Sequence, residues 1–342
     1  MKDAEQVMII SKTPFRLLWG AVFAALPLSL STPKTTNAEL IWSYVGDPGN
    51  MPDTNGHGSV PYPFLMSTFE VTNDDYVEFL NAVAADGDPN GLYNFGMDWL
   101  ADFSGGIRRS TSGDRFTYQI QLNRGQRPVV NVEFYSAMRY ANWLHNGRPT
   151  GPQGPTTTED GAYTLGSEAI PDALVVRNPD ARFFIPNEDE WYKAAYYKSG
   201  GLDAGYWQYP TQSNEAPAGR LPPGDSNSAN YNLAHTNVTI VGSYPLAVGP
   251  YGTYDQAGNA AEMLETIRLS GPFIDRVVRG GSWIIDISDS TNAAVSFSIG
   301  PSGSLSTHGF RVAAIVPEPS TCAYLLGVLA LGPALRWLRA QF

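Results

Sequence analysis

The stretch from Tyr251 to Arg311 places carboxylates and glycines at close spacing, with Asp255, Gly258 and Glu262 in its first part. Glycine lets the backbone turn so that carbonyl oxygens can point inward beside side-chain oxygens. A hard cation such as Ca²⁺ prefers that mixture of carboxylate and carbonyl ligands. The pattern therefore indicates a calcium site, and the alternative is a turn whose carboxylates are solvated.

Other residue types that could do chemistry are scattered. The four histidines, His57, His145, His235 and His308, show no clustered spacing, which disfavours a facial histidine set for iron. No Gly-x-Ser-x-Gly motif stands in a strand–helix context, which disfavours a serine hydrolase. The single cysteine, Cys322, lies near the C-terminal end of the sequence, so the central part has no cysteine pair for a disulfide.

The composition bounds the class of protein. The formal net charge of −11 opposes long-range attraction to nucleic acid, so no nucleic-acid partner is expected. Aromatic residues make up 12% of the chain, which provides large side chains for a core.

Three short helices are predicted to position this stretch. Thr72 and Asp75 form a capping box, and apolar residues follow at helical spacing: Tyr76, Phe79, Leu80 and Val83. Asn131 is predicted to cap a second helix, whose apolar face holds Ala137, Tyr140, Ala141 and Leu144. Asn187 and Glu190 form another cap pair, at the start of a helix over 188–197.

Between these helices the chain predicts short strands and long loops. We expect β-like runs within 39–66, a hairpin around 117–120 and a strand over Val238 to Tyr244. Residues 146–179 and 202–228 are dense in loop-forming residues such as Gly, Pro and Asn, which predicts long surface loops. The simplest account is one α+β domain with little regular secondary structure.

Several motifs occur in a characteristic order: Glu70-Val71-Thr72-Asn73, Arg127-Pro128-Val129-Val130, Ile185-Pro186-Asn187-Glu188, Arg279-Gly280-Gly281-Ser282-Trp283 and Gly309-Phe310-Arg311. Together they resemble the formylglycine-generating enzyme, or sulfatase-modifying factor, family. The resemblance covers roughly 41–314 and implies a variant of the C-type-lectin-like fold.

The resemblance also implies which chemistry to look for. Enzymes of that family oxidise a sulfatase cysteine to formylglycine with two cysteines that follow the Gly-Gly-Ser motif and bind copper(I), which suits soft sulfur ligands. Those positions fall at Ile285 and Ser290, so no copper is expected. We therefore expect a noncatalytic binding or structural domain that faces a glycan or protein ligand. The alternative is a divergent oxidoreductase that matures sulfatases by generating formylglycine.

A structural calcium is implied as well, and its ligands map to Asp255, the carbonyls of Gly258 and Ala260, and Glu262. A second family calcium would use Asn230 and the carbonyl of Tyr231. Its aspartate position falls near Leu233, which disfavours that second site.

The first 38 residues have the form of a secretory signal peptide. An apolar run from Leu17 to Leu30 follows two basic residues, and Thr36-Asn37-Ala38 offers a cleavage site with small residues. The alternative is an N-terminal membrane anchor. A mature chain would begin near Glu39, so the domain is predicted to span 39–316.

Residues 317–342 resemble a PEP-CTERM sorting tail, with Pro317-Glu318-Pro319, a short apolar run, and then Arg336 and Arg339. The apolar run is shorter than the roughly 20 residues of a stable membrane span. The alternative is a terminal core helix. The resemblance implies anchoring in the inner membrane of a Gram-negative bacterium, processing by an exosortase-like enzyme, and a final place in the cell envelope or outside the cell.

Overall fold

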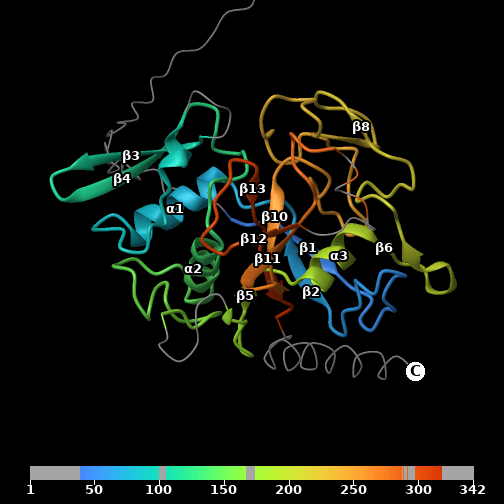
Figure 1. Cartoon of the computed structure of the whole chain (residues 1–342), viewed down its shortest axis with the longest axis horizontal. Coiled ribbons are helices and arrows are strands. Elements are labelled where there is room, and N and C mark those ends of the chain that lie inside the picture. The colour runs from blue at the N-terminus through green and yellow to red at the C-terminus, as the bar shows by residue number, and fades with distance from the viewer. Residues whose placement is uncertain are drawn as a thin grey trace, which may run out of the picture. The chain divides into compact units, whose positions relative to one another are not determined.

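Short strands and helices joined by long loops make up the domain (Figure 1). The computed structural model of the chain describes residues 39–99, 105–166, 174–286, 288, 291 and 297–317. Within them, the prediction of one α+β domain with little regular secondary structure is confirmed. The predictions for 1–38 and 318–342 lie outside the described residues, as does Ser290. No helix in the described part of the chain is long and apolar enough to span a membrane.

Two four-stranded sheets organise the domain. The first has the antiparallel order β1 (Trp42–Val45), β2 (Phe64–Ser67), β14 (Ala313–Ile315) and β5 (Phe183–Phe184). The second has the order β12 (Phe297–Ile299), β11 (Phe273–Arg279), β10 (Ala261–Ser270) and β13 (His308–Gly309). β13 runs parallel to β10 and places Gly309 opposite Glu262. This pairing sets the position of Arg311 two residues later.

Two of the three helix caps form as predicted. α1 (Asn73–Val83) begins after a capping box in which Asp75 N–H donates to Thr72 Oγ1 at 3.2 Å. α3 (Glu188–Tyr196) begins with the box of Asn187 and Glu190, whose backbone N–H donates to Asn187 Oδ1 at 2.9 Å.

The predicted cap of the second helix is wrong. α2 (Phe134–His145) begins after Glu133, and no side chain caps it. Asn131 instead adopts a left-handed φ of 61°, and its N–H donates to the carbonyl of Leu305 at 3.0 Å. A loop contact from a distant part of the chain therefore decides the conformation of Asn131.

The predicted strand over 238–244 is also wrong, because side chains take its backbone N–H groups. Thr239 N–H donates to Asn259 Oδ1 at 2.8 Å, and Gly242 N–H donates to Asp255 Oδ2 at 2.6 Å. The predicted hairpin is confirmed as β3 (Ile107–Ser112) and β4 (Arg115–Ile120).

Aromatic side chains join α1 to α2 and pack α3 on the second sheet. On one side, Phe79 of α1 lies with its ring centroid 5.4 Å from that of Trp143 of α2. On the other, Trp191 of α3 is fully buried with Leu264 and Val277 of β10 and β11. In Figure 1 the two central strands accordingly lie between α2 and α3. Burial of such large side chains contributes strongly to the apolar core.

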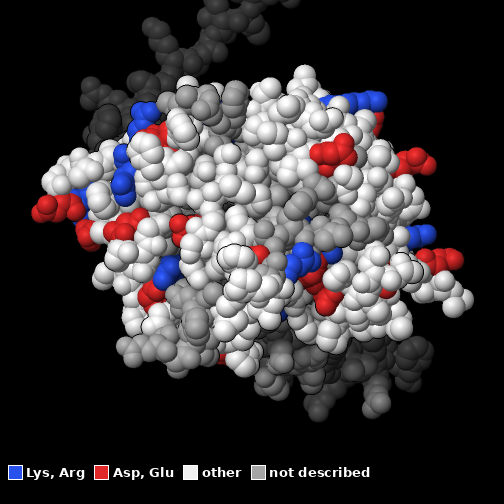
Figure 2. All heavy atoms as spheres, in the orientation of Figure 1, with Lys and Arg blue, Asp and Glu red and all other residues white. Residues whose placement is uncertain are grey.

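The remaining described elements are short. They are η1 (Phe95–Asp98), β6 (Tyr197–Lys198), η3 (Gly201–Asp203), β7 (Gly205–Tyr206), β8 (Ala218–Gly219) and β9 (Ser228–Ala229). On the face seen in Figure 2, acidic and basic side chains are interspersed, so this face carries no broad field of one sign.

Candidate functional site

Glu262 and Arg311 form a fully buried ion pair in the interior. Arg311 Nε donates to Glu262 Oε2 at 2.5 Å, and Arg311 Nη2 donates to Oε1 at 2.6 Å. Trp191 Nε1 donates to Oε2 at 2.6 Å. Both charged side chains are 0% exposed, so these charge-assisted bonds offset the loss of hydration.

The same guanidinium ties three segments together. Arg311 Nη1 donates to the carbonyl of Ser67 at 2.9 Å, and Nη2 donates to the carbonyl of Tyr254 at 2.9 Å. Burial opposes the charge on Arg311, but attraction by Glu262 more than offsets it, so the pKa of Arg311 is raised. Arg311 therefore stays charged and links β2, the turn before β10, and β10 itself.

Two further carboxylates surround the pair. Glu70 is 1% exposed; its Oε1 accepts from Asn259 Nδ2 at 2.9 Å, and its Oε2 has no hydrogen-bond partner among the described residues. Burial, and then repulsion by Asp255, raises the pKa of Glu70 well above its usual range. Burial also raises the pKa of Asp255 to about 6. Both shifts have the same first cause, which is the loss of hydration of a carboxylate in the interior.

The four predicted calcium ligands lie in and after one tight turn. Asp255 has a φ of 63° and Gly258 a φ of 79°, where a Cβ would come within 2.2 Å of the carbonyl oxygen of Asn230. Ala260 is buried directly before β10, and Glu262 lies on β10. Glycine is therefore required at position 258, because the backbone of the turn packs directly against that of Asn230.

These oxygens suit calcium in kind, but both carboxylates already accept hydrogen bonds, Asp255 from Gly242 N–H and Glu262 from Arg311 and Trp191. Glu262 uses three of its roughly four lone-pair sites for Arg311 and Trp191. In the part of the chain that the structure describes, no group of three or more Asp, Glu, His or Cys residues could hold a metal ion. Calcium binding at Asp255, Gly258, Ala260 and Glu262 therefore stays a prediction.

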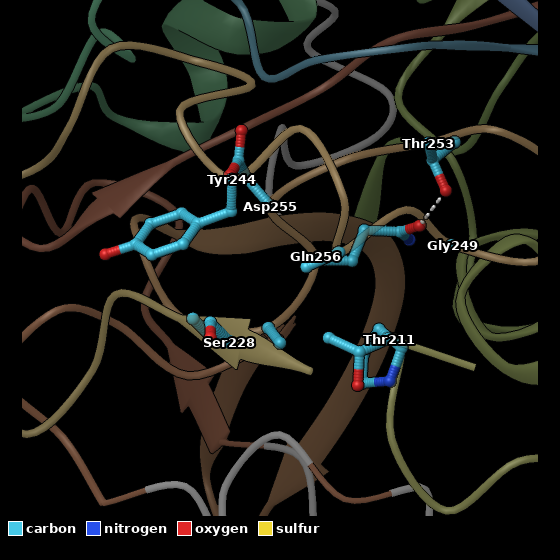
Figure 3. Close-up of a pocket in the computed structure, with 11 residues that line it drawn as sticks. Thr211, Ser228, Tyr244, Gly249, Thr253, Asp255 and Gln256 are labelled. Carbon is cyan, nitrogen blue, oxygen red and sulfur yellow. Dashed lines mark hydrogen bonds between the residues drawn. The ribbon is translucent and has the colours of Figure 1, made fainter. Parts of the chain in front are cut away.

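A small polar cavity lies beside Asp255, as Figure 3 shows. Its volume is about 10 Å³, which is room for about one water molecule. Thr211, Ser228 and Thr253 line it, and Thr253 Oγ1 donates to Gln256 Oε1 at 2.6 Å. The cavity is too small for a substrate.

The loop at the family's cysteine positions is held by backbone contacts. The N–H of half-buried Ile285 donates to the carbonyl of Ser282 at 3.1 Å, and the carbonyl of Ile285 accepts from Asn232 N–H at 3.0 Å. Leu233 N–H donates to the carbonyl of Trp283 at 2.8 Å. The aliphatic side chain of Ile285 offers neither a metal ligand nor a nucleophile.

The positions of the second family calcium are only partly suited to a cation. Asn230 Nδ2 donates to the carbonyl of Asn237 at 2.9 Å, while the buried Oδ1 of Asn230 accepts no hydrogen bond from the described residues. Leu233 is 52% exposed and supplies no carboxylate.

Sequence reasoning missed a second group of carboxylates. Arg177 Nη2 lies 3.0 Å from both Glu190 Oε1 and Glu265 Oε1. Tyr62 hydroxyl donates to Glu190 at 2.7 Å, and Tyr163 hydroxyl donates to Glu265 at 2.7 Å. Burial raises the pKa of Glu265 to about 7, which Arg177 partly opposes. The five residues come from separate segments, so their spacing carried no signal.

Comparison with solved structures finds three that are similar over most of this chain. The chain is 19% identical to Treponema denticola variable protein 1, with a TM-score of 0.48, covering 81% of this chain and 95% of that one. It is 19% identical to CarF, with a TM-score of 0.49, covering 82% and 99%. For PvdO from Pseudomonas aeruginosa the identity is 17% and the TM-score 0.44, covering 81% and 92%.

Among curated proteins, the chain is similar to serine/threonine-protein kinases named Pkn1. The identity is 26% over 273 residues for the protein of Chlamydia pneumoniae, covering 75% of this chain and 34% of the kinase. It is 25% over 269 residues for that of Chlamydia caviae, covering 74% and 33%. The chain thus spans about a third of the length of these relatives.

The model of one protein family matches nearly the whole described domain. The match runs over residues 45–316, from β1 to just beyond β14. It includes the Glu262–Arg311 pair and the loop around Ile285. The chain therefore belongs to the sulfatase-modifying factor enzyme 1-like domain family.

Proposed function

We propose that the chain is an exported, noncatalytic member of this family that acts as a binding or structural domain of the cell envelope. The observation that carries the proposal is Ile285, with Ser290, at the positions of the family's cysteine pair, in a domain with no cysteine between 39 and 316. Copper(I) binding and a mixed disulfide with a substrate both require thiolate. Since fold alone does not define function, this loss outweighs the shared architecture.

The surroundings of Glu262 support a structural role for the motif residues Glu262 and Arg311. The carboxylate of Glu262 is engaged by Arg311 and Trp191, and the cavity beside Asp255 has room for about one water molecule. Neither feature offers a reacting group to a peptide. We accordingly propose no catalytic residue.

The test is an oxygen-consumption and mass assay of the purified full chain with a sulfatase Cys-x-Pro-x-Arg peptide and copper(I). We expect no formylglycine above background and no stoichiometric copper binding. The variant Ile285→Cys with Ser290→Cys serves as the matched control and is expected to gain copper binding. Turnover by the unaltered chain would refute the proposal and favour a divergent oxidoreductase.

We further propose that residues 1–38 direct export and are removed, and that 317–342 anchor the domain until an exosortase-like enzyme processes the tail. The apolar run behind basic residues and the Pro317-Glu318-Pro319 sequence support this order of events. Intact-mass analysis of the exported protein should find a chain that begins near Glu39. A chain that still begins at Met1 would refute the export step.

A further inference from the structure

An open groove of about 620 Å³ lies between the loop 49–54 and the β6–β7 hairpin, residues 197–206. Its volume falls within the range of small-molecule pockets. Both walls belong to the described residues. The groove lies on other segments than the Glu262–Arg311 pair and the Ile285 loop.

A tyrosine cluster makes the groove rigid. The ring centroid of Tyr206 lies 5.6 Å from that of Tyr192 and 5.2 Å from that of Tyr197. The Tyr206 hydroxyl accepts from Asn50 Nδ2 at 2.7 Å and donates to the carbonyl of Met51 at 2.8 Å. These bonds tie the loop to the hairpin, so the groove is formed before any ligand arrives.

The groove carries one charge. Among the residues that line it, Asp53 is the only acidic or basic side chain. Its carboxylate accepts from Asn55 N–H at 2.6 Å and from the Tyr192 hydroxyl, which fix its position. A carboxylate with no lining cation accepts hydrogen bonds from hydroxyl groups and repels anions.

Bare backbone and apolar surface complete the walls. At Gly49, Gly201 and Gly205 a Cβ would meet no heavy atom within 4 Å, so these positions face open space and permit close approach of a ligand. Met51 is 78% exposed, and Tyr206 is half-buried. The groove thus combines an aromatic and thioether surface with hydrogen-bond acceptors.

We propose that this groove binds a neutral saccharide, which places an apolar ring face on Tyr206 and Met51 and donates hydroxyl hydrogen bonds to Asp53. A pyranose has such an apolar C–H face, which the negative face of an aromatic ring attracts, and a polar edge of hydroxyls. The proposal rests on the proposed binding function and names its site and ligand class.

The test titrates the full chain, in a detergent without a sugar headgroup, with maltose, cellobiose, lactose and chitobiose. Saturation-transfer NMR follows binding up to about 50 mM, where even a millimolar site is saturated. At least one disaccharide should bind saturably. Sialyllactose should bind at least about tenfold more weakly than lactose, because Asp53 repels its carboxylate.

Gly205→Leu is the decisive variant. Gly205 lines the groove, has no left-handed φ, and its Cβ would contact nothing, so a leucine adds bulk at the groove wall without backbone strain. It should weaken binding by at least about tenfold. Gly300→Leu is the matched control, because Gly300 also lies outside the left-handed region of φ and a Cβ there would meet no heavy atom within 4 Å. This variant should bind disaccharides as tightly as the unaltered chain does.

Absence of saturable binding for all four disaccharides, or equal affinity of Gly205→Leu and the unaltered chain, would overturn the proposal. Isolated envelope material separates this failure from failure of the proposed function. The unaltered chain and Gly205→Leu could bind that material equally while no disaccharide binds. The domain would then bind through another surface, and only the assignment of the groove would be wrong. Turnover of the sulfatase peptide would instead refute the noncatalytic function, whatever the groove binds.

Discussion

Replacing Glu265 by Gln should make the stability of the protein less dependent on pH. The side chain of Glu265 is 12% exposed, and burial raises its pKa from 4.5 to about 7 despite the nearby guanidinium of Arg177. The Tyr163 hydroxyl donates to Oε2 of Glu265 at 2.7 Å, and a glutamine oxygen preserves that acceptor. The substitution therefore removes the titration while it keeps the hydrogen bond.

The sign follows from the raised pKa. Between pH 4.5 and about 7 the folded protein binds more protons at Glu265 than the unfolded chain does. The free energy of unfolding therefore falls as pH rises through this window, and the full cost is present above pH 7. At about 1.4 kcal/mol per pH unit, ionising Glu265 in the folded state costs about 3 kcal/mol.

The assay is chemical unfolding of the full chain and of Glu265→Gln at about pH 5 and pH 8. The free energy of unfolding of the variant, relative to that of the unaltered chain, should rise by about 2–3 kcal/mol from pH 5 to pH 8. Other titrating groups contribute to both proteins and cancel in this difference. Glu78→Gln is a suitable control, since Glu78 also pairs with an arginine, Arg148, on a separate part of the fold, and it reports the effect of losing such a pair by itself. The reasoning would be contradicted if Glu265→Gln and the unaltered chain differed in unfolding free energy by the same amount at both pH values.

Three further predictions test the interior and one helix. Calcium should raise the melting temperature over that in chelator, and Glu262→Gln should abolish the shift; a calcium-independent melting temperature in the unaltered chain would remove the calcium assignment. Arg311→Met should cost about 3–5 kcal/mol in unfolding free energy because it leaves the Glu262 charge unpaired. Adding Glu262→Leu should then recover part of that loss, whereas strictly additive costs would show that the two side chains do not interact. Asn187→Ala should cost about 1 kcal/mol by removing the α3 cap, which thermal unfolding can measure.

Local signals in the sequence predicted the helices well. The boxes of Thr72 with Asp75 and of Asn187 with Glu190 involve residues three apart, so their geometry follows from local chain structure. α3 ends at Tyr196, one residue before the predicted end, and the β3–β4 hairpin closes locally as well.

Long-range contacts explain the errors. Asn131 has the residue type of a cap, but its N–H donates to the carbonyl of Leu305, more than 170 residues away by position. The segment 238–244 has strand-like residues, yet Asn259 and Asp255 take its N–H groups. Neither partner is visible in a short window of sequence.

The sequence predicted where the candidate site lies but not which groups its side chains contact. Asp255, Gly258 and Glu262 do lie together around one turn, as their spacing indicated. What the spacing could not show is that Arg311, brought opposite by the parallel β10–β13 pairing, supplies a positive charge to Glu262.

The motifs by which the family is recognised make contacts in this chain that stabilise the fold. Arg279 of the Arg-Gly-Gly-Ser-Trp motif pairs with buried Glu188 at 2.6 Å, which holds α3 against β11. A Cβ at Gly280 would lie 3.2 Å from the carbonyl oxygen of Gln256, so the glycine permits close packing of the turn that holds Asp255 and Gly258. Arg311 of the Gly-Phe-Arg motif anchors three segments. The cysteines of the family's enzymes would stand instead at the positions of Ile285 and Ser290, and Ile285 takes part in none of these contacts. On the proposed noncatalytic function, these motifs build the fold without the cysteine pair, because their contacts do not involve Ile285.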